Sequence, residues 1–292
     1  MFEHHLISMD SRAHLKNCRH ISDAIADAIA PLIGEYEDRT FERGITGDVT
    51  YEIDVPIEDA VAGFFADNEI PATVSTEDTG TRDFNGGGPI YLIDPLDGSR
   101  NARRGLPFYC CSIAVFPPGS TELSQAEVSL IRRLDHDETF HAISGEGAMH
   151  DGAPMHPSKK TGITDAIICL GSHFASSYEA HRDLVAKLAK MGDGGPQDAM
   201  LKCLGSTALE LAHIACGRAD MLVDLRYGHG LSVCPKTYDI AAGIHICRQA
   251  GAKAIYGSEN LPQELPPDPS IPIQVAAAAN EPLFTLLSNT IR

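Results

Sequence analysis

The stretch that decides the fold runs from residue 90 to residue 101 and reads IYLIDPLDGSRN. Its apolar start, bounded by glycines before it and a turn after it, predicts the end of a buried strand. Two carboxylates, Asp94 and Asp97, follow three residues apart. Pro95 fixes its own φ angle, and Gly98 allows a backbone shape that other residues resist. We therefore expect both carboxylates to point at one spot beyond the end of the strand.

The same turn offers further oxygen ligands. The Leu96 carbonyl and the Ser99 hydroxyl lie within it, and the turn contains neither cysteine nor histidine. Clustered oxygens of this kind suit a hard cation such as Mg²⁺. A bare pair of aspartates at this spacing is explained equally well by an acidic surface turn with a capping serine. The longer sequence context favours the cation.

A second signature lies far along the chain, where residues 238–243 read YDIAAG and lead into a helical stretch. Together with DPLDGSRN at residues 94–101, it resembles the paired signatures of the inositol monophosphatase superfamily, although Tyr238 stands where that superfamily usually has Trp. The superfamily also includes fructose-1,6-bisphosphatases and 3′-phosphoadenosine-phosphate phosphatases. The resemblance covers most of the chain. It implies a mixed α/β (α+β) fold, the layered α-β-α-β-α sandwich of the sugar phosphatases, with the site between two halves.

The pattern of elements agrees with two halves. Residues 1–150 would form an N-terminal α+β half that carries most metal ligands. Residues 151–292 would form a C-terminal α/β half with the substrate loop and the last metal ligand. A Rossmann fold is disfavoured because no GxGxxG motif follows a strand. Apolar periodicity predicts helices and strands, joined by a hairpin or loop over 35–47 and a turn and joint over 145–164. The helices are expected at 11–34, 56–68, 176–191 and 281–291, and the strands at 72–76, 110–116, 126–131, 138–143, 166–170, 219–225, 253–256 and 274–278.

The resemblance also implies the catalytic groups. Asp54 and Ser99 would orient the attacking water and accept its proton, and Glu77 would act with them. Ser99 stands where the family more often has Thr. An alternative for Asp54 is a cap on a helix that begins at Pro56. Two or three Mg²⁺ ions would be held by Glu77, Asp94, the Leu96 carbonyl, Asp97 and Asp239.

Substrate contacts are expected from loops on both sides of the site. A helix N-terminus with exposed amides suits an anion or sugar hydroxyls, although an ordinary cap explains Ser206 equally well. Arg226 and Lys202 are the candidates for holding a second phosphate, and the alternative for Arg226 is a surface ion pair with Asp224. The expected substrate-binding residues are Gly98, Ser99, Gly205, Ser206, Thr207, Arg226 and Lys202.

Composition excludes several classes of protein. The chain has 292 residues and a formal net charge of −17, which argues against nucleic-acid binding because that needs a basic face. No run of about 18 apolar residues exists, and the N-terminus lacks the features of a secretory signal. Eight cysteines without a CxxC pair favour free thiols in a reducing compartment. We therefore expect no membrane association, a cytoplasmic location and, from the resemblance, a homodimer.

The predicted function is a Mg²⁺-dependent phosphomonoesterase that hydrolyses small sugar or polyol phosphates with a metal-activated water. The expected substrates are inositol 1-phosphate and fructose 1,6-bisphosphate, since residues 107–109 and 223–226 resemble archaeal members that have both activities. Phosphoryl transfer needs positioning and charge neutralisation, so the absence of an evident Cys or His nucleophile is no obstacle. Two alternatives stay open, a nucleotide 3′-phosphatase and a catalytically silent phosphate-binding protein. The full acidic set argues against the silent protein.

Overall fold

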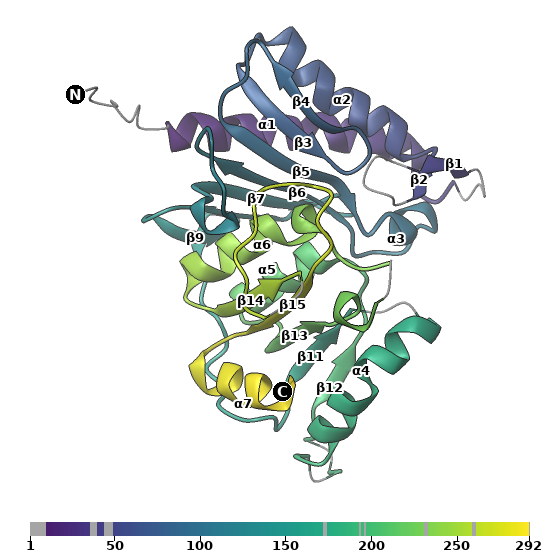
Figure 1. The fold of residues 1–292 in the computed structure, drawn as a ribbon, viewed down its shortest axis with the longest axis vertical. Coiled ribbons are helices and arrows are strands. Elements are labelled where there is room, and N and C mark those ends of the chain that lie inside the picture. Colours follow the sequence, from purple (N-terminus) through teal and green to yellow (C-terminus); the bar gives the residue numbers. More distant parts are fainter. Residues whose placement is uncertain are drawn as a thin grey trace.

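The computed structural model describes residues 10–35, 40–43, 49–171, 174–192, 194–195, 197–230, 233–258 and 261–291. Its elements stack in five layers, in which helices and sheets alternate (Figure 1). The predicted α-β-α-β-α sandwich is confirmed. The division of the chain at residue 150 stays a prediction. Among the described helices, none combines the length and the apolar character that a membrane crossing needs.

The first layer consists of α1 (Ser11–Ile29) and α2 (Asp54–Asp67), which pack on one face of the larger sheet. Apolar side chains at spacings of three and four form the buried stripe of α1, as predicted. A 3₁₀ turn (Ala30–Leu32) ends this helix. Helix α2 begins two residues before Pro56, so Asp54 lies in its first turn.

The larger sheet has eight strands in the order β10-β9-β8-β7-β6-β5-β3-β4. Strands β3 and β5 are parallel neighbours, so the residues that follow β3 lie at the same edge of the sheet as the end of β5. The predicted pairing of 126–131 with 138–143 is confirmed as β7 with β8. The strands are β3 (Ala72–Thr76), β4 (Gly80–Phe84), β5 (Ile90–Asp97), β6 (Cys110–Phe116), β7 (Val128–Arg133), β8 (Thr139–Ile143), β9 (Gly147–His150) and β10 (Ala153–Pro154).

Two short strands lie where the sequence predicted only a turn and a joint. Strands β9 and β10 extend the sheet beyond β8 and carry the chain toward its second half. They were missed because two to four residues are too few to show alternating polarity. A separate pair, β1 (Thr40–Arg43) and β2 (Val49–Tyr51), is antiparallel. It supports the hairpin expected over 35–47, of which residues 36–39 and 44–47 lie outside the described part.

The middle layer consists of α5 (Thr207–Ala215) and α6 (Thr237–Ala250), which lie between the two sheets (Figure 1). Both helices are buried along most of their length because each has a sheet on either side. A side chain at Gly243 would come within 2.6 Å of Leu211, so glycine permits the close contact of the two helices. Buried His245 contacts the hydroxyls of Ser129 at 2.9 Å and Ser144 at 3.0 Å, which ties α6 to the larger sheet.

The smaller sheet has the strand order β12-β11-β13-β15-β14, and α4 (Phe174–Ala189) and α7 (Glu281–Ile291) cover its outer face (Figure 1). Leu184 and Leu188 of α4 are buried as predicted. Met191, predicted to face inward, is 48% exposed because α4 ends before it. The strands are β11 (Ile167–Leu170), β12 (Met200–Lys202), β13 (Met221–Asp224), β14 (Lys253–Gly257) and β15 (Gln274–Ala278).

Candidate active site

A bulge in β5 brings two carboxylates together. Asp94 pairs with Ser112 of β6 and Asp97 pairs with Cys110, so two residues of β5 oppose one residue of β6 between these pairs. In a regular strand, residues three apart face opposite sides, and one extra residue reverses that alternation. The prediction that the strand ends before Asp94 was wrong, because β5 continues to Asp97. The expected convergence of the two aspartates arises from this bulge.

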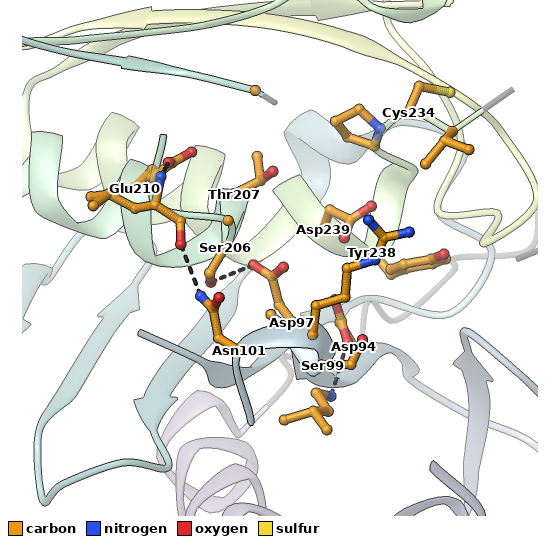
Figure 2. Close-up of a pocket in the computed structure, with 18 of the residues that line it drawn as sticks. Asp94, Asp97, Ser99, Asn101, Ser206, Thr207, Glu210, Cys234, Tyr238 and Asp239 are labelled. Atoms are coloured by element: carbon orange, nitrogen blue, oxygen red, sulfur yellow. Dashed lines mark hydrogen bonds between the residues drawn. The ribbon is translucent and has the colours of Figure 1, made fainter. Parts of the chain in front are cut away.

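Two further acids reach the same spot from other elements. Asp239 lies in the first turn of α6, and its carboxylate accepts the Lys236 amide at 2.5 Å. Carboxylate oxygens of Asp94, Asp97 and Asp239 all lie within 4.8 Å of one another (Figure 2). Glu77 follows β3, the parallel neighbour of β5, and its charge acts on Asp94. Four carboxylates from three segments therefore share one site.

These acids line a pocket of about 450 Å³. The pocket brings together most of the predicted site residues. Lys202 and Asp54 are the two that do not line it; Lys202 ends β12 one residue before the lining residue Cys203. The predicted residues that line the pocket are Glu77, Asp94, Leu96, Asp97, Gly98, Ser99, Gly205, Ser206, Thr207, Arg226 and Asp239.

Burial makes this cluster electrostatically costly. Asp94 is 1% exposed, and burial, followed by the charges of Glu77, Asp97 and Asp239, holds its pKa well above the usual range. Burial also raises the pKa of Asp97 to about 6. Such carboxylates stay ionised together only if cations neutralise them; without cations, some of them take up protons. The donor set contains oxygen alone, so these residues fit a hard divalent cation.

The N-terminus of α5 holds Asp97 in place. The Ser206 hydroxyl donates to Asp97 Oδ2 at 2.7 Å (Figure 2). The Ala208 amide donates to the same oxygen at 2.7 Å. Ser206 is also the N-cap of α5, where its hydroxyl accepts the Leu209 amide at 3.4 Å. The sequence predicted that this helix end would contact substrate. In the structure, the Ser206 hydroxyl and the Ala208 amide at this helix end form hydrogen bonds with Asp97, a proposed metal ligand.

Two residues that received no role from the sequence fix the loop before α5. The Asn101 side-chain amide donates to the carbonyls of Phe108 and Leu204, both at 2.9 Å, and so ties the signature turn to that loop. Glu210 is 2% exposed, accepts the Leu204 amide at 3.1 Å and lines the pocket. Burial raises the pKa of Glu210 to about 8. The sequence feature that could have identified Glu210 is an acidic residue among the mostly apolar residues of α5.

Arg226 forms a buried ion pair with Asp224. Its Nε donates to Asp224 Oδ1 and Oδ2 at 2.9 and 3.1 Å, and its Nη2 donates to Oδ2 at 2.6 Å. Its Nη1 donates to the Val233 carbonyl at 3.2 Å. Arg226 is 7% exposed and Asp224 is fully buried, so the alternative of a surface pair was wrong about its location. Among the described lining residues, Arg226 and Arg100 are the cationic ones.

The proposed water-activating residues occupy different surroundings. Ser99 begins the short helix α3 (Ser99–Arg103) and lines the pocket. Gly98 before it has φ +92°, and a Cβ there would meet the Phe108 carbonyl at 2.9 Å, so the turn requires glycine. Asp54 is 8% exposed and accepts the Tyr51 amide at 2.6 Å. Burial raises the pKa of Asp54 to about 7, and nearby acids add to the shift.

Comparison with known proteins identifies the family. The model of the inositol monophosphatase family matches residues 17–289. The chain belongs to this family. Members named inositol monophosphatase and fructose-1,6-bisphosphatase are hydrolases of phosphate monoesters, and the chain is accordingly a phosphatase of this type.

Individual members of the inositol monophosphatase family resemble the chain over most or about half of its length. A fructose-1,6-bisphosphatase/inositol-1-monophosphatase of Methanothermobacter thermautotrophicus is 28% identical over 240 residues, 79% of this chain and 80% of the relative. An inositol-1-monophosphatase of Bacillus subtilis is 30% identical over 56% of this chain and 55% of its own length. The crystal structure of the extragenic suppressor protein SuhB of Bartonella henselae superposes with a TM-score of 0.76 at 19% identity, covering 96% of this chain and 98% of SuhB. The last comparison supports the fold.

Proposed function

We propose that this phosphatase depends on Mg²⁺ and hydrolyses small phosphorylated polyols. The observation that carries the proposal is the convergence of Asp94, Asp97 and Asp239 within 4.8 Å, in a pocket that Glu77 also lines. Divalent cations neutralise such a cluster, and oxygen ligands suit Mg²⁺ better than zinc or copper. Two or three ions would be held by Glu77, Asp94, the Leu96 carbonyl, Asp97 and Asp239. When bound, Mg²⁺ supplies charge neutralisation for the phosphoryl group and makes water more acidic.

The residues of the chain would divide the remaining work. Ser99, which begins α3 and lines the pocket, would form a hydrogen bond with the attacking water. Asp54 would take the proton, and its raised pKa of about 7 suits a group that exchanges protons near neutral pH. Ser206 and Ala208 would keep Asp97 oriented. No covalent intermediate with the protein is required, because positioning and charge neutralisation dominate phosphoryl transfer.

The lining of the pocket supports a small polar substrate. Its volume of about 450 Å³ matches a sugar-sized molecule, and its walls combine acids with the hydroxyls of Ser99 and Thr207. Gly205 has φ +84°, which lets the loop turn back into α5 beside the site. We propose inositol 1-phosphate and fructose 1,6-bisphosphate as substrates, since a relative that resembles most of this chain carries both activities in its name.

A second phosphate would need a cation on the pocket wall. Arg226 and Arg100 line the pocket, whereas Lys202 does not, so we assign the second phosphate to the arginines. Hydrogen bonds to the Asp224 carboxylate fix the orientation of the Arg226 guanidinium on the pocket wall. The homodimeric state and the cytoplasmic location stay predictions.

A panel of phosphate-release assays tests the substrate class. Inositol 1-phosphate, fructose 1,6-bisphosphate and 3′-phosphoadenosine 5′-phosphate are supplied at equal concentration, with Mg²⁺ and with a chelator. We expect release from the first two only when Mg²⁺ is present. Exclusive release from the nucleotide would replace the polyol assignment. No release from any of the three esters, with Mg²⁺ or with the chelator, would support a silent phosphate-binding protein.

A further inference from the structure

A second cavity lies on the opposite side of the larger sheet from α5 and α6, under the first half of α1. It has a volume of about 360 Å³, which is within the range of small-molecule sites. We call it the α1 groove, and it shares no lining residue with the active site. Helix α1 contacts β8, and the residues that line the groove come from this helix, from β8 and β9, and from the turn that joins these strands. Its lining residues are Arg12, Leu15, Lys16, Arg19, His141, Ile143, Glu146, Gly147 and Met149.

The rim of the α1 groove is cationic, although the chain as a whole carries a net charge of −17. Arg12, Lys16 and Arg19 stand four and three residues apart, so they share one face of the helix. Arg12 lies 3.2 Å from Glu146, but both side chains are at least half exposed, and such pairs contribute little. Within the described part of the chain, the side chains of Lys16 and Arg19 have no ion-pair partner. The rim therefore carries a net positive charge.

Apolar side chains form the floor of the α1 groove. Leu15 and Ile143 are buried, and Met149 is half-buried beside them. The floor therefore offers a ligand an apolar surface.

We propose that the α1 groove binds a small organic phosphate with an apolar body. The phosphate would be held by Lys16 and Arg19, since a guanidinium forms paired hydrogen bonds with phosphate oxygens. The apolar body would lie on Leu15, Ile143 and Met149. Both parts of the ligand follow from the lining, because a cationic rim alone would suit any anion and an apolar floor alone would suit an uncharged molecule. The proposal is independent of the phosphatase activity.

Calorimetric titration with phenylphosphonate tests the proposal, because its carbon–phosphorus bond resists hydrolysis. The titration is done at low ionic strength with a chelator, so that the active-site carboxylates repel the probe. The variant is K16E/R19E, and the matched control is K159E/K190E, which changes the net charge equally at exposed positions outside the groove. We expect affinity to fall at least tenfold in K16E/R19E and to stay within twofold of the unmodified protein in the control.

Two outcomes would overturn the proposal. Equal affinity in all three proteins would place the probe elsewhere, and an equal loss in both variants would show that only net charge matters. Methylphosphonate gives a second measurement, because it has the same charge and lacks the ring. We expect it to bind at least fivefold more weakly than phenylphosphonate. Equal affinity for the two phosphonates would show that the apolar floor does not contribute to binding. The melting temperature of each variant checks that it is folded.

Discussion

Ser206→Ala separates two roles that one hydroxyl could have. In the structure this hydroxyl donates to Asp97 at 2.7 Å and also caps α5. If its main partner is Asp97, the substitution leaves the backbone amides of Ala208 and Gly98 to orient that carboxylate. The pKa of Asp97 would then rise further, and binding of Mg²⁺ would weaken. If the hydroxyl instead contacts substrate, as the sequence suggested, substrate affinity would fall and metal affinity would not.

The size of the effect follows from the kind of hydrogen bond. A bond to a charged group contributes about 1.5–3 kcal/mol, so the Mg²⁺ concentration at half-maximal activity should rise by roughly 10- to 100-fold. Loss of the helix cap costs about 1 kcal/mol, so the melting temperature should fall by a few degrees. The assay measures initial rates of phosphate release against Mg²⁺ at saturating substrate, and against substrate at saturating Mg²⁺.

Ser206→Thr is the control, because threonine keeps both the hydroxyl and the capping ability. Its Mg²⁺ dependence should stay within about threefold of the unmodified enzyme. The reasoning is refuted if Ser206→Ala raises KM for the substrate while its Mg²⁺ dependence is unchanged. That result would assign Ser206 to substrate binding and would mean that backbone amides are enough to orient Asp97.

Three further predictions follow from the site and its supports. Ser99→Ala should lower kcat with little change in KM, whereas Ser99→Thr should be tolerated; an unchanged kcat with a raised KM would assign Ser99 to substrate binding. Arg226→Ala should destabilise the fold by about 3–5 kcal/mol, because it leaves the buried charge of Asp224 unpaired. Urea unfolding should show that adding Asp224→Asn recovers part of this loss, and no recovery would mean that the pair is not coupled. Burial lowers the pKa of His245 to about 4, so between about pH 6.5 and pH 4 the unfolded chain binds a proton that the folded chain does not. Unfolding free energy should therefore fall as pH falls through that window, by up to ~1.4 kcal/mol per unit, and this slope should be shallower in His245→Asn.

Local sequence patterns predicted individual helices and strands, and the family resemblance implied how they are layered. The apolar stripe of α1 and the alternation in β7 and β8 depend on neighbours in sequence, so periodicity shows them. Met191 was misplaced because periodicity does not fix where a helix ends. Strands β9 and β10 were missed because their pairing with the rest of the sheet, and not their own composition, makes them strands. Long-range pairing is the part of the fold that the pattern does not contain.

In the candidate site, too, local motifs were predictable from the sequence and long-range contacts were not. The acids were found from two signatures, and the structure places Asp94, Asp97 and Asp239 together. The bulge that aligns them depends on β6, more than ten residues away, and was not foreseen. The bond from Ser206 to Asp97 joins residues 109 positions apart. The sequence therefore identified the proposed metal-binding acids, whereas the residues that orient them, such as Ser206, could be identified only from the structure.

Phosphate release by Asp94→Asn tests the central claim most directly. Asn keeps the size of the side chain and removes one of the clustered charges, so the variant should fold and should be at least as stable as the unmodified enzyme. Inositol 1-phosphate is supplied with saturating Mg²⁺ and, separately, with a chelator. The account predicts Mg²⁺-dependent release by the unmodified enzyme, none with the chelator, and a loss of several orders of magnitude in the folded variant. A folded Asp94→Asn enzyme with near-normal activity, or full activity of the unmodified enzyme in chelator, would contradict it.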